Sequence, residues 1–271
     1  IINQEETKMK KISAIMLSLT LAGSILTGCA KTNEPAPTPE ENKVLQIYFV
    51  RHGKTFFNST DQVQGFADTP LTEKGIEQAI TLGKGLADVQ FTTAYTGELG
   101  RQRKTAQLIL GENNNDIPQI VEHVGFNEWN YGGYEGKMNA EMWDPIFAEA
   151  GAQFDPYWSE YGKVLEYYGG DRALADAIAK NDPIGAAETY DEILERAQKA
   201  MDQLVEESLA AGGGNVLVVS SGSQIPTILE LIAPGVYDGS DEISNCSVSI
   251  VTYQDGTYTI DMIGDTSYLG E

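Results

Sequence analysis

Apolar runs and amphipathic stretches alternate along the chain from residue 44 onward, and this alternation predicts its secondary structure. Uncharged runs rich in β-branched residues predict strands, which are 44–50, 91–96, 117–121 and 215–220. Apolar residues at helical spacing predict helices, which are 71–87, 99–110, 187–210 and 224–232, within a region 137–210 that is mainly helical by pattern. Strands that alternate with helices predict an α/β fold, a three-layer α/β/α sandwich with a mostly parallel central sheet.

The last apolar segment has a different pattern. Two short strand-like runs within 247–263 are separated by Asp255-Gly256, a dipeptide that is typical of a tight hairpin turn. We therefore expect an antiparallel pair after the last helix.

The first 43 residues do not fit this alternation. Met9-Lys10-Lys11 precedes an apolar run to Leu26 and then small residues up to Cys29, an order typical of an export signal and short for a membrane span. The end of the run resembles a bacterial lipobox, which implies cleavage before Cys29 and lipidation of its sulfur. The alternative is an uncleaved anchor or a buried helix. Residues 1–8 read as an upstream extension.

These patterns predict three parts: an extension and lipoprotein signal peptide (1–28), a Pro-rich polar tether (29–43) and one folded domain (44–271). Lipidated Cys29 would hold the domain at the extracytoplasmic face of a bacterial cell membrane. Cys246 would then be the one remaining cysteine, so no disulfide framework is expected. The sequence favours no particular oligomeric state.

The charge balance excludes one class of partner. Forty acidic against eighteen basic residues give a formal net charge of −22, and such a surface repels nucleic acid. Clusters of basic residues are therefore informative in this chain. One such cluster is Arg101, Arg103 and Lys104 at the start of a predicted helix, where the dipole disfavours cations and a bound anion would offset it.

Chemistry-bearing residues follow the first predicted strand, at the carboxyl end where ligands bind in open α/β sheets. They are Arg51, His52, Thr55 and Asn58. The adjacent guanidinium favours a neutral imidazole at His52, and a neutral imidazole suits attack on an anionic centre. Taken alone, Arg-His-Gly is equally compatible with an ordinary loop.

The following residues extend the motif: Gln64-Gly65-Phe66-Ala67-Asp68-Thr69-Pro70-Leu71-Thr72, then Gly75, Gln78 and Ala79. Together they match R-H-G-x-T-x-x-N and Q-G-x-x-D-x-P-L-T-x-x-G-x-x-Q-A, the pattern of the histidine phosphatase superfamily. The chain thus resembles the phosphoglycerate-mutase-like proteins over nearly the whole predicted domain. Gln62 departs from the pattern, because many members carry an Arg there.

The resemblance implies a role for each matched residue. His52 would be the nucleophile and Glu128 of the Glu128-to-Gly136 segment the proton donor, while Arg51, Asn58 and Arg101 would bind the phosphoryl group. Thr55, Gln64 and Gly65 are candidate substrate contacts, and an insert at about 137–185 would cap the site. A small phosphorylated substrate would be hydrolysed through phosphohistidine without a metal or other cofactor. His123 has no motif position, and we expect it to be structural or exposed.

The turn after the strand at 215–220 departs from the family pattern V-V-S-H-G-G. Here it reads Val218-Val219-Ser220-Ser221-Gly222-Ser223, so the resemblance assigns Ser221 to the position of the second histidine. A lost charge-assisted hydrogen bond weakens transition-state binding by roughly 1.5–3 kcal/mol. We therefore expect a phosphatase of reduced or altered activity. The alternative is a catalytically impaired lipoprotein that binds a phosphorylated ligand.

Overall fold

The computed structural model describes residues 43–237, 239 and 242–270 of the chain. The predicted signal peptide, lipidated Cys29 and nearly all of the tether lie outside these residues and stay predictions. Among the described residues, no helix has both the length and the hydropathy that crossing a bilayer requires.

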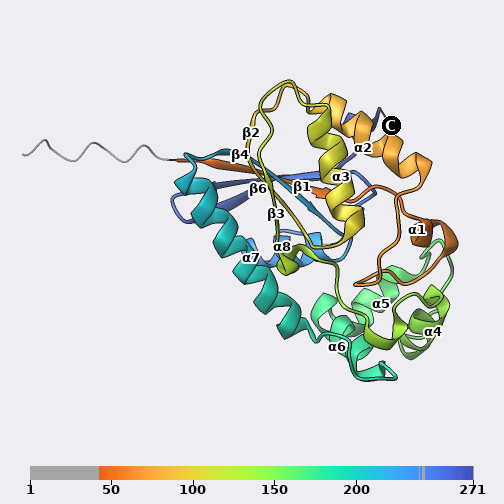
Figure 1. The fold of residues 1–271 in the computed structure, drawn as a ribbon. Helices are drawn as coiled ribbons and strands as arrows, with labels where there is room; N and C mark the ends of the chain where they lie inside the picture. Colours follow the sequence, from red (N-terminus) through yellow and green to blue (C-terminus); the bar gives the residue numbers. More distant parts are fainter. Residues whose placement is uncertain (1–42, 238, 240–241, 271) are drawn as a thin grey trace, which may run out of the picture. The chain divides into compact units, whose positions relative to one another are not determined.

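One mixed sheet forms the centre of the domain (Figure 1). Its strands are β1 (Leu45–Arg51), β2 (Phe91–Thr96), β3 (Ile120–Glu122), β4 (Gly214–Ser220), β5 (Val248–Gln254) and β6 (Thr257–Asp265). Their order is β3-β2-β4-β1-β5-β6; the first four are parallel, and β5 is antiparallel to both of its neighbours. The predicted mostly parallel sheet is confirmed, and β4 lies beside β1 although 162 residues, 52–213, separate Arg51 from Gly214 along the chain.

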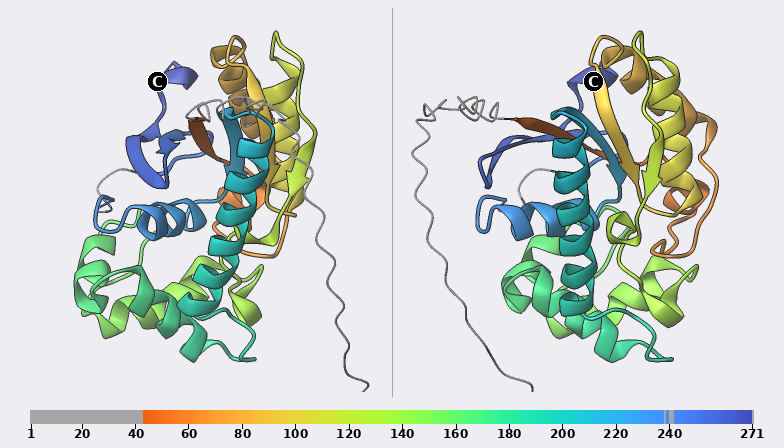
Figure 2. Two further views of the ribbon diagram at one scale, coloured as in Figure 1. Left: turned by 90° about the vertical axis from the view of Figure 1, so that its left-hand side faces the viewer. Right: turned by 60° about the vertical axis from the view of Figure 1, so that its left-hand side comes forward.

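Helices cover both faces of this sheet (Figures 1 and 2). They are α1 (Phe56–Thr60), α2 (Glu73–Gly85), α3 (Gly100–Gly111), α4 (Asn139–Glu149), α5 (Tyr161–Tyr168), α6 (Asp171–Asn181), α7 (Tyr190–Ala210) and α8 (Gln224–Ile232). Three 3₁₀ turns complete the described elements: η1 (Val124–Phe126), η2 (Gly132–Tyr134) and η3 (Ser267–Leu269).

The uncharged strand runs are explained by burial on both faces. Ile47 and Phe49 of β1 pack in one cluster with α7 and α8, whereas Tyr48 and Val50 pack in a second cluster with α2 and α3. Successive side chains of a strand point to opposite faces, so a strand covered by helices on both sides needs apolar residues at every position. The predicted three layers are thus confirmed.

Most element predictions agree with the structure, and two do not. The strand predicted at 117–121 is instead β3 at Ile120–Glu122, because Ile117 is 57 % exposed and Pro118 has no N–H to donate. Helix α1 was not predicted. It has five residues and buries none of them, so it has no apolar period, and a capping box from Thr55 starts it.

Helices α4, α5 and α6 occupy the segment predicted as a cap, and they gather at one end of the sheet (Figure 2). They share a third apolar cluster, which also contains Trp129, Tyr131 and Tyr134 from the chain just before them. Most aromatic rings of the segment pack within that cluster, namely Trp143, Phe147, Phe154, Trp158, Tyr161 and Tyr168. Tyr157 and Tyr167 are exposed instead.

Candidate active site

His52 lies directly after β1, where the loops that follow β1 and β4 meet. Arg51 pairs with Ser220 in the parallel register, and the His52 backbone N–H donates to the Ser220 carbonyl at 3.0 Å. The Asn245 amide donates to the His52 carbonyl at 2.8 Å from a third segment. This brings the Arg-His-Gly loop and the Ser-Ser-Gly-Ser turn together at the carboxyl ends of two parallel strands.

The protonation state of His52 follows from its contacts. Its Nδ1 atom lies 2.9 Å from the Gly53 carbonyl oxygen, which only accepts hydrogen bonds, so Nδ1 carries the proton and Nε2 keeps its lone pair. Burial first, and then the charges of Arg101 and Arg51, hold the pKa of the imidazole well below its usual 6.5. The ring is therefore neutral and nucleophilic at Nε2 near neutral pH.

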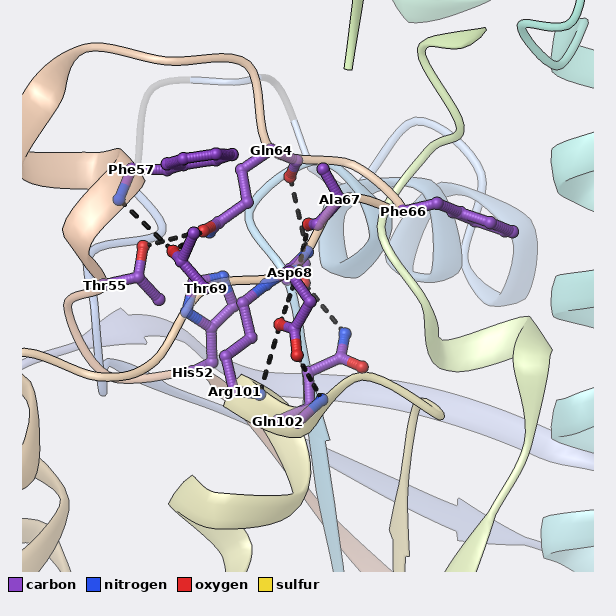
Figure 3. Close-up of polar contacts among 12 residues, drawn as sticks. His52, Thr55, Phe57, Gln64, Phe66, Ala67, Asp68, Thr69, Arg101 and Gln102 are labelled. Atoms are coloured by element: carbon purple, nitrogen blue, oxygen red, sulfur yellow. Dashed lines mark hydrogen bonds and ion pairs between the residues drawn. The ribbon is translucent and has the colours of Figure 1, made fainter. Parts of the chain in front are cut away.

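Arg101 is 1 % exposed and holds the loop that precedes α2 (Figure 3). Its guanidinium donates to the carbonyls of Ala67 at 2.9 Å and Gly65 at 2.7 Å, and Nη1 lies 3.2 Å from the Asp68 carboxylate. Its Nε is buried and has no partner among the described residues. Asp68 also accepts from the Gly100 backbone N–H at 2.8 Å, so a carboxylate offsets the dipole at the start of α3.

The other two basic residues of that helix differ in their surroundings. Arg103 forms an exposed ion pair with Glu122. Lys104 lines a surface hollow together with Arg101 and residues 68–71 of the loop. An anion suggested by three clustered cations therefore does not involve Arg103, which already has a carboxylate partner.

Glu135 anchors the same loop, a role that the sequence did not reveal. Its carboxylate accepts four backbone N–H groups, three of them from Gly65, Phe66 and Ala67 at 2.8–3.0 Å and one from Tyr131 at 2.9 Å. The Glu-Gly at the end of the Glu128-to-Gly136 motif was the available signal. By fixing these backbone groups, Glu135 also fixes the carbonyls to which Arg101 donates.

Arg51 contributes a second guanidinium, on a side chain that is partly buried. Its Nη1 donates to the Ile243 carbonyl at 2.7 Å, and its Nε is buried without a partner among the described residues. A Cβ at Gly222 would lie 3.2 Å from Cζ of Arg51, closer than such contacts normally come. The glycine of the Ser-Ser-Gly-Ser turn thus leaves room for this guanidinium.

Gln64 presents a third unpartnered donor. Its Oε1 accepts from the hydroxyls of Thr55 at 2.9 Å and Thr69 at 2.6 Å (Figure 3). Those hydroxyls in turn accept the backbone N–H groups of Asn58 and Phe57. The Gln64 amide nitrogen is therefore left buried and without an acceptor in the described part of the chain.

Asn58 does not reach His52 in this structure. Its side-chain oxygen accepts the Thr55 backbone N–H at 3.1 Å and so completes the capping box of α1. No described contact joins its amide nitrogen to His52 or to either arginine.

Glu128 faces the turn after β4. Its Oε2 accepts the Ser223 backbone N–H at 3.0 Å, and its Oε1 accepts that of Trp129 at 3.0 Å. Arg196 of α7 donates to the Glu128 carbonyl at 2.8 Å and forms a buried pair with Glu188 at 2.8 Å. Arg196 thus positions the backbone that carries this carboxylate, and it is another residue that the sequence analysis did not identify.

Ser221 is fully buried beside Gln102. The Gln102 amide nitrogen donates to Ser221 Oγ at 2.8 Å and to the Phe126 carbonyl at 2.9 Å. His123 begins the turn that carries Phe126, where its Nδ1 accepts the Gly125 N–H at 2.9 Å. The expected structural role of His123 agrees with this contact.

Taken together, the site residues are mostly buried, and two guanidinium groups act on the His52 imidazole. His52 is 3 % exposed, and Glu128 is 6 % exposed. Among the described residues, no group of three or more His, Cys, Asp and Glu side chains is placed to hold a metal ion. The arrangement offers a neutral nitrogen nucleophile, two guanidinium groups and one carboxyl group, and these groups suit transfer of a phosphoryl unit.

The protein is thus an α/β domain whose site residues suit phosphoryl transfer. The model of the family described as "Histidine phosphatase superfamily (branch 1)" matches residues 47–266, and the chain belongs to that family.

Several proteins are similar to this chain over most of its length. The chain is 28 % identical over 233 residues to a probable phosphoglycerate mutase GpmB of Erwinia tasmaniensis, covering 83 % of this chain and 95 % of that protein. It is 27 % identical over 230 residues to the metal-independent phosphoserine phosphatase of Arabidopsis thaliana, covering 84 % and 85 %. The crystal structure of phosphoglycerate mutase from Bacillus anthracis superposes with a TM-score of 0.72 at 35 % identity, covering 84 % and 96 %. These relationships support a phosphatase-type enzyme.

Proposed function

We propose that this protein is a phosphomonoester hydrolase that forms a phosphohistidine on His52. One observation carries the proposal: three buried donors, Nε of Arg51, Nε of Arg101 and Nε2 of Gln64, have no partner among the described residues, and the charges of both arginines act on the neutral His52 imidazole. Unpaired buried donors are costly, so such a set is expected where a ligand supplies the acceptors. A phosphoryl group has three strong acceptor oxygens.

The proposed reaction has two steps. Nε2 of His52 attacks phosphorus, the bond from phosphorus to the ester oxygen breaks, and Glu128 gives its proton to the departing alkoxide. Water then attacks phosphorus, the bond to Nε2 breaks, and Glu128 takes a proton from that water. Arg51 and Arg101 stabilise charge on the phosphoryl oxygens in both steps.

We favour hydrolysis over mutase activity because hydrolysis places fewer demands on the site. A mutase must in addition keep water away from its phosphoenzyme until the intermediate rebinds. Relatives of this chain carry the names of both kinds of enzyme, so the acceptor has to be measured. Detection of free phosphate in place of a transferred phosphoryl group distinguishes the two.

A binding function is the second candidate, and Ser221 favours it. We propose that Ser221 stands at the position of the family's second histidine, where a neutral hydroxyl stabilises the transition state less than a charged donor does. The protein would then be a slow phosphatase or, at the limit, a receptor for a phosphorylated ligand.

We further propose that Cys29 is lipidated and holds the domain at the extracytoplasmic face of a bacterial membrane.

Phosphate release from an aryl phosphate by residues 30–271 tests the enzymatic proposal. We expect wild-type protein to release phosphate and His52→Ala to release none above the uncatalysed rate. A panel of sugar phosphates, nucleotides and phosphoamino acids then identifies the substrate class. If wild type and His52→Ala are equally inert across the panel, the binding function replaces the enzymatic one.

A further inference from the structure

We propose that Gln102 is a positioning residue that, together with Ser221, replaces the missing imidazole as a hydrogen-bond donor to the phosphoryl group. The inference rests on the proposed function and concerns the same site. It assigns a role to Gln102, which no motif position suggested.

The direction of the hydrogen bond between these residues is fixed by a third group. The Gln102 amide nitrogen also donates to the Phe126 carbonyl, which cannot donate in return, so the nitrogen and oxygen of this amide are distinguished. The bond of 2.8 Å to Ser221 therefore runs from Gln102 to the serine oxygen. Ser221 Oγ accepts in this bond and keeps its own hydrogen.

That hydrogen has no acceptor among the described residues. Ser221 is fully buried, and it directly follows Ser220, whose carbonyl accepts the His52 N–H. A hydroxyl that accepts one hydrogen bond is also a better donor in the next, because bonds in a chain polarise one another.

The partners of the Phe126 carbonyl argue against a merely structural role for Gln102. Its Oε1 is buried and has no donor partner among the described residues. The Phe126 carbonyl is also held by the Ser220 hydroxyl at 2.8 Å, so it does not depend on Gln102.

Gln102 also occupies the space that a histidine would need. An imidazole at position 221 would extend beyond the present Oγ, toward an amide nitrogen only 2.8 Å away. Restoring the family residue alone should therefore create a clash. We expect Ser221→His to lower activity further and the pair Ser221→His with Gln102→Ala to recover at least part of it.

The test is a double-mutant cycle with Gln102→Met and Ser221→Ala, measured by kcat and KM on an aryl phosphate. Methionine keeps the length of the side chain and removes the donor. We expect each single change to lower kcat by about tenfold or more and the double variant to lose little beyond the larger single loss, since a hydrogen bond to a charged group contributes at least that much. Independent, multiplicative losses would overturn the proposal, as would a wild-type kcat for Gln102→Met.

Gln224→Met is the matched control. Gln224 is also fully buried, its amide nitrogen donates to the neighbouring Gly125 carbonyl at 2.7 Å, and its Oε1 is likewise unpartnered in the described part of the chain. Among the described residues, no hydrogen bond joins its side chain to Ser221. We expect its kcat to stay within about twofold of wild type, because its amide donates to the Gly125 carbonyl and not to Ser221. A loss caused only by removing a buried amide would be similar for both variants. Equal losses for both variants would show a structural role.

Two further readouts separate this inference from the proposed function. Neither serine nor glutamine titrates near neutral pH, so the recovered Ser221→His and Gln102→Ala enzyme should show a decline in kcat on rising pH in addition to any that wild type has. If wild type and His52→Ala are both inert, the same cycle is run on the affinity for inorganic phosphate by calorimetry. Coupled losses of affinity would then support the pair, and independent losses would overturn it.

Discussion

The Nδ1 atom of His52 donates to the carbonyl oxygen of Gly53 across 2.9 Å, within the same turn of backbone. This contact assigns the proton of the imidazole and leaves Nε2 as the free nucleophilic nitrogen. The nucleophile is thus oriented by its own neighbour, and the two guanidinium groups act on its charge state.

The acid side of the pH profile should reflect this charge state. Burial and the nearby arginines hold the pKa of His52 well below 6.5, and only the neutral ring attacks phosphorus. Activity should therefore persist as pH falls through 6.5 and decline only at lower pH. The measurement is kcat/KM against pH, corrected for substrate ionisation. A decline centred at the ordinary imidazole value would contradict the assignment.

The same pKa shift should make stability depend on pH. The unfolded chain binds a proton at His52 below about 6.5 and the folded chain does not, so stability is full above that pH and falls as pH decreases toward the folded pKa. Between pH 7.5 and 5.5 this removes roughly 1 kcal/mol. Urea unfolding of wild type and His52→Gln at both pH values isolates the effect, because His123 titrates in both proteins. An identical pH dependence would exclude it.

Glu135→Gln should loosen the loop that orients Arg101. One oxygen and an NH₂ group would replace a carboxylate that accepts four backbone N–H groups, three of them from residues 65–67. We expect a loss of about 2 kcal/mol in unfolding free energy and a raised KM, since several buried donors lose their acceptor. Glu141→Gln is the control, because that exposed carboxylate accepts a single long bond from Met138. Equal, small effects of both changes would refute the role of Glu135.

Arg196→Met should destabilise the fold and lower kcat. It leaves Glu188 partly buried without its cation and frees the Glu128 carbonyl, and losing one member of a buried pair costs roughly 3 kcal/mol. The exposed pair of Arg172 with Asp191 offers the control, and Arg172→Met should change stability by less than about 1 kcal/mol. Thermal or denaturant unfolding compares the two. Similar losses of unfolding free energy at both positions would contradict the prediction that burial makes the Arg196 ion pair the more important of the two.

The sequence predicts the fold well where local pattern and burial agree. β2 and α8 begin and end at the predicted residues, because uncharged β-branched runs and apolar helical spacing have few alternatives in a doubly covered sheet. Strand β3 was displaced because it has three residues and is only partly buried. Helix α1 was missed because it has no buried face.

The site residues also fall into two groups, those that the local sequence indicates and those that only tertiary contacts reveal. The motif indicates His52, Arg101 and Glu128, because their neighbours in sequence carry the pattern. The contacts of Gln102 and Arg196 join residues that are 119 and 68 positions apart. No local period encodes such pairs, so only the tertiary structure reveals that Gln102 donates to Ser221 and that Arg196 holds the Glu128 backbone.

Trapping of the phosphoenzyme tests the central claim most directly. Wild-type protein is mixed with a ³²P-labelled phosphomonoester, quenched in base, and examined for an acid-labile, base-stable label. The account predicts label on the His52 peptide, at Nε2, and none in His52→Ala. Phosphate release without any labelled His52 peptide, or label that survives in His52→Ala, would contradict it.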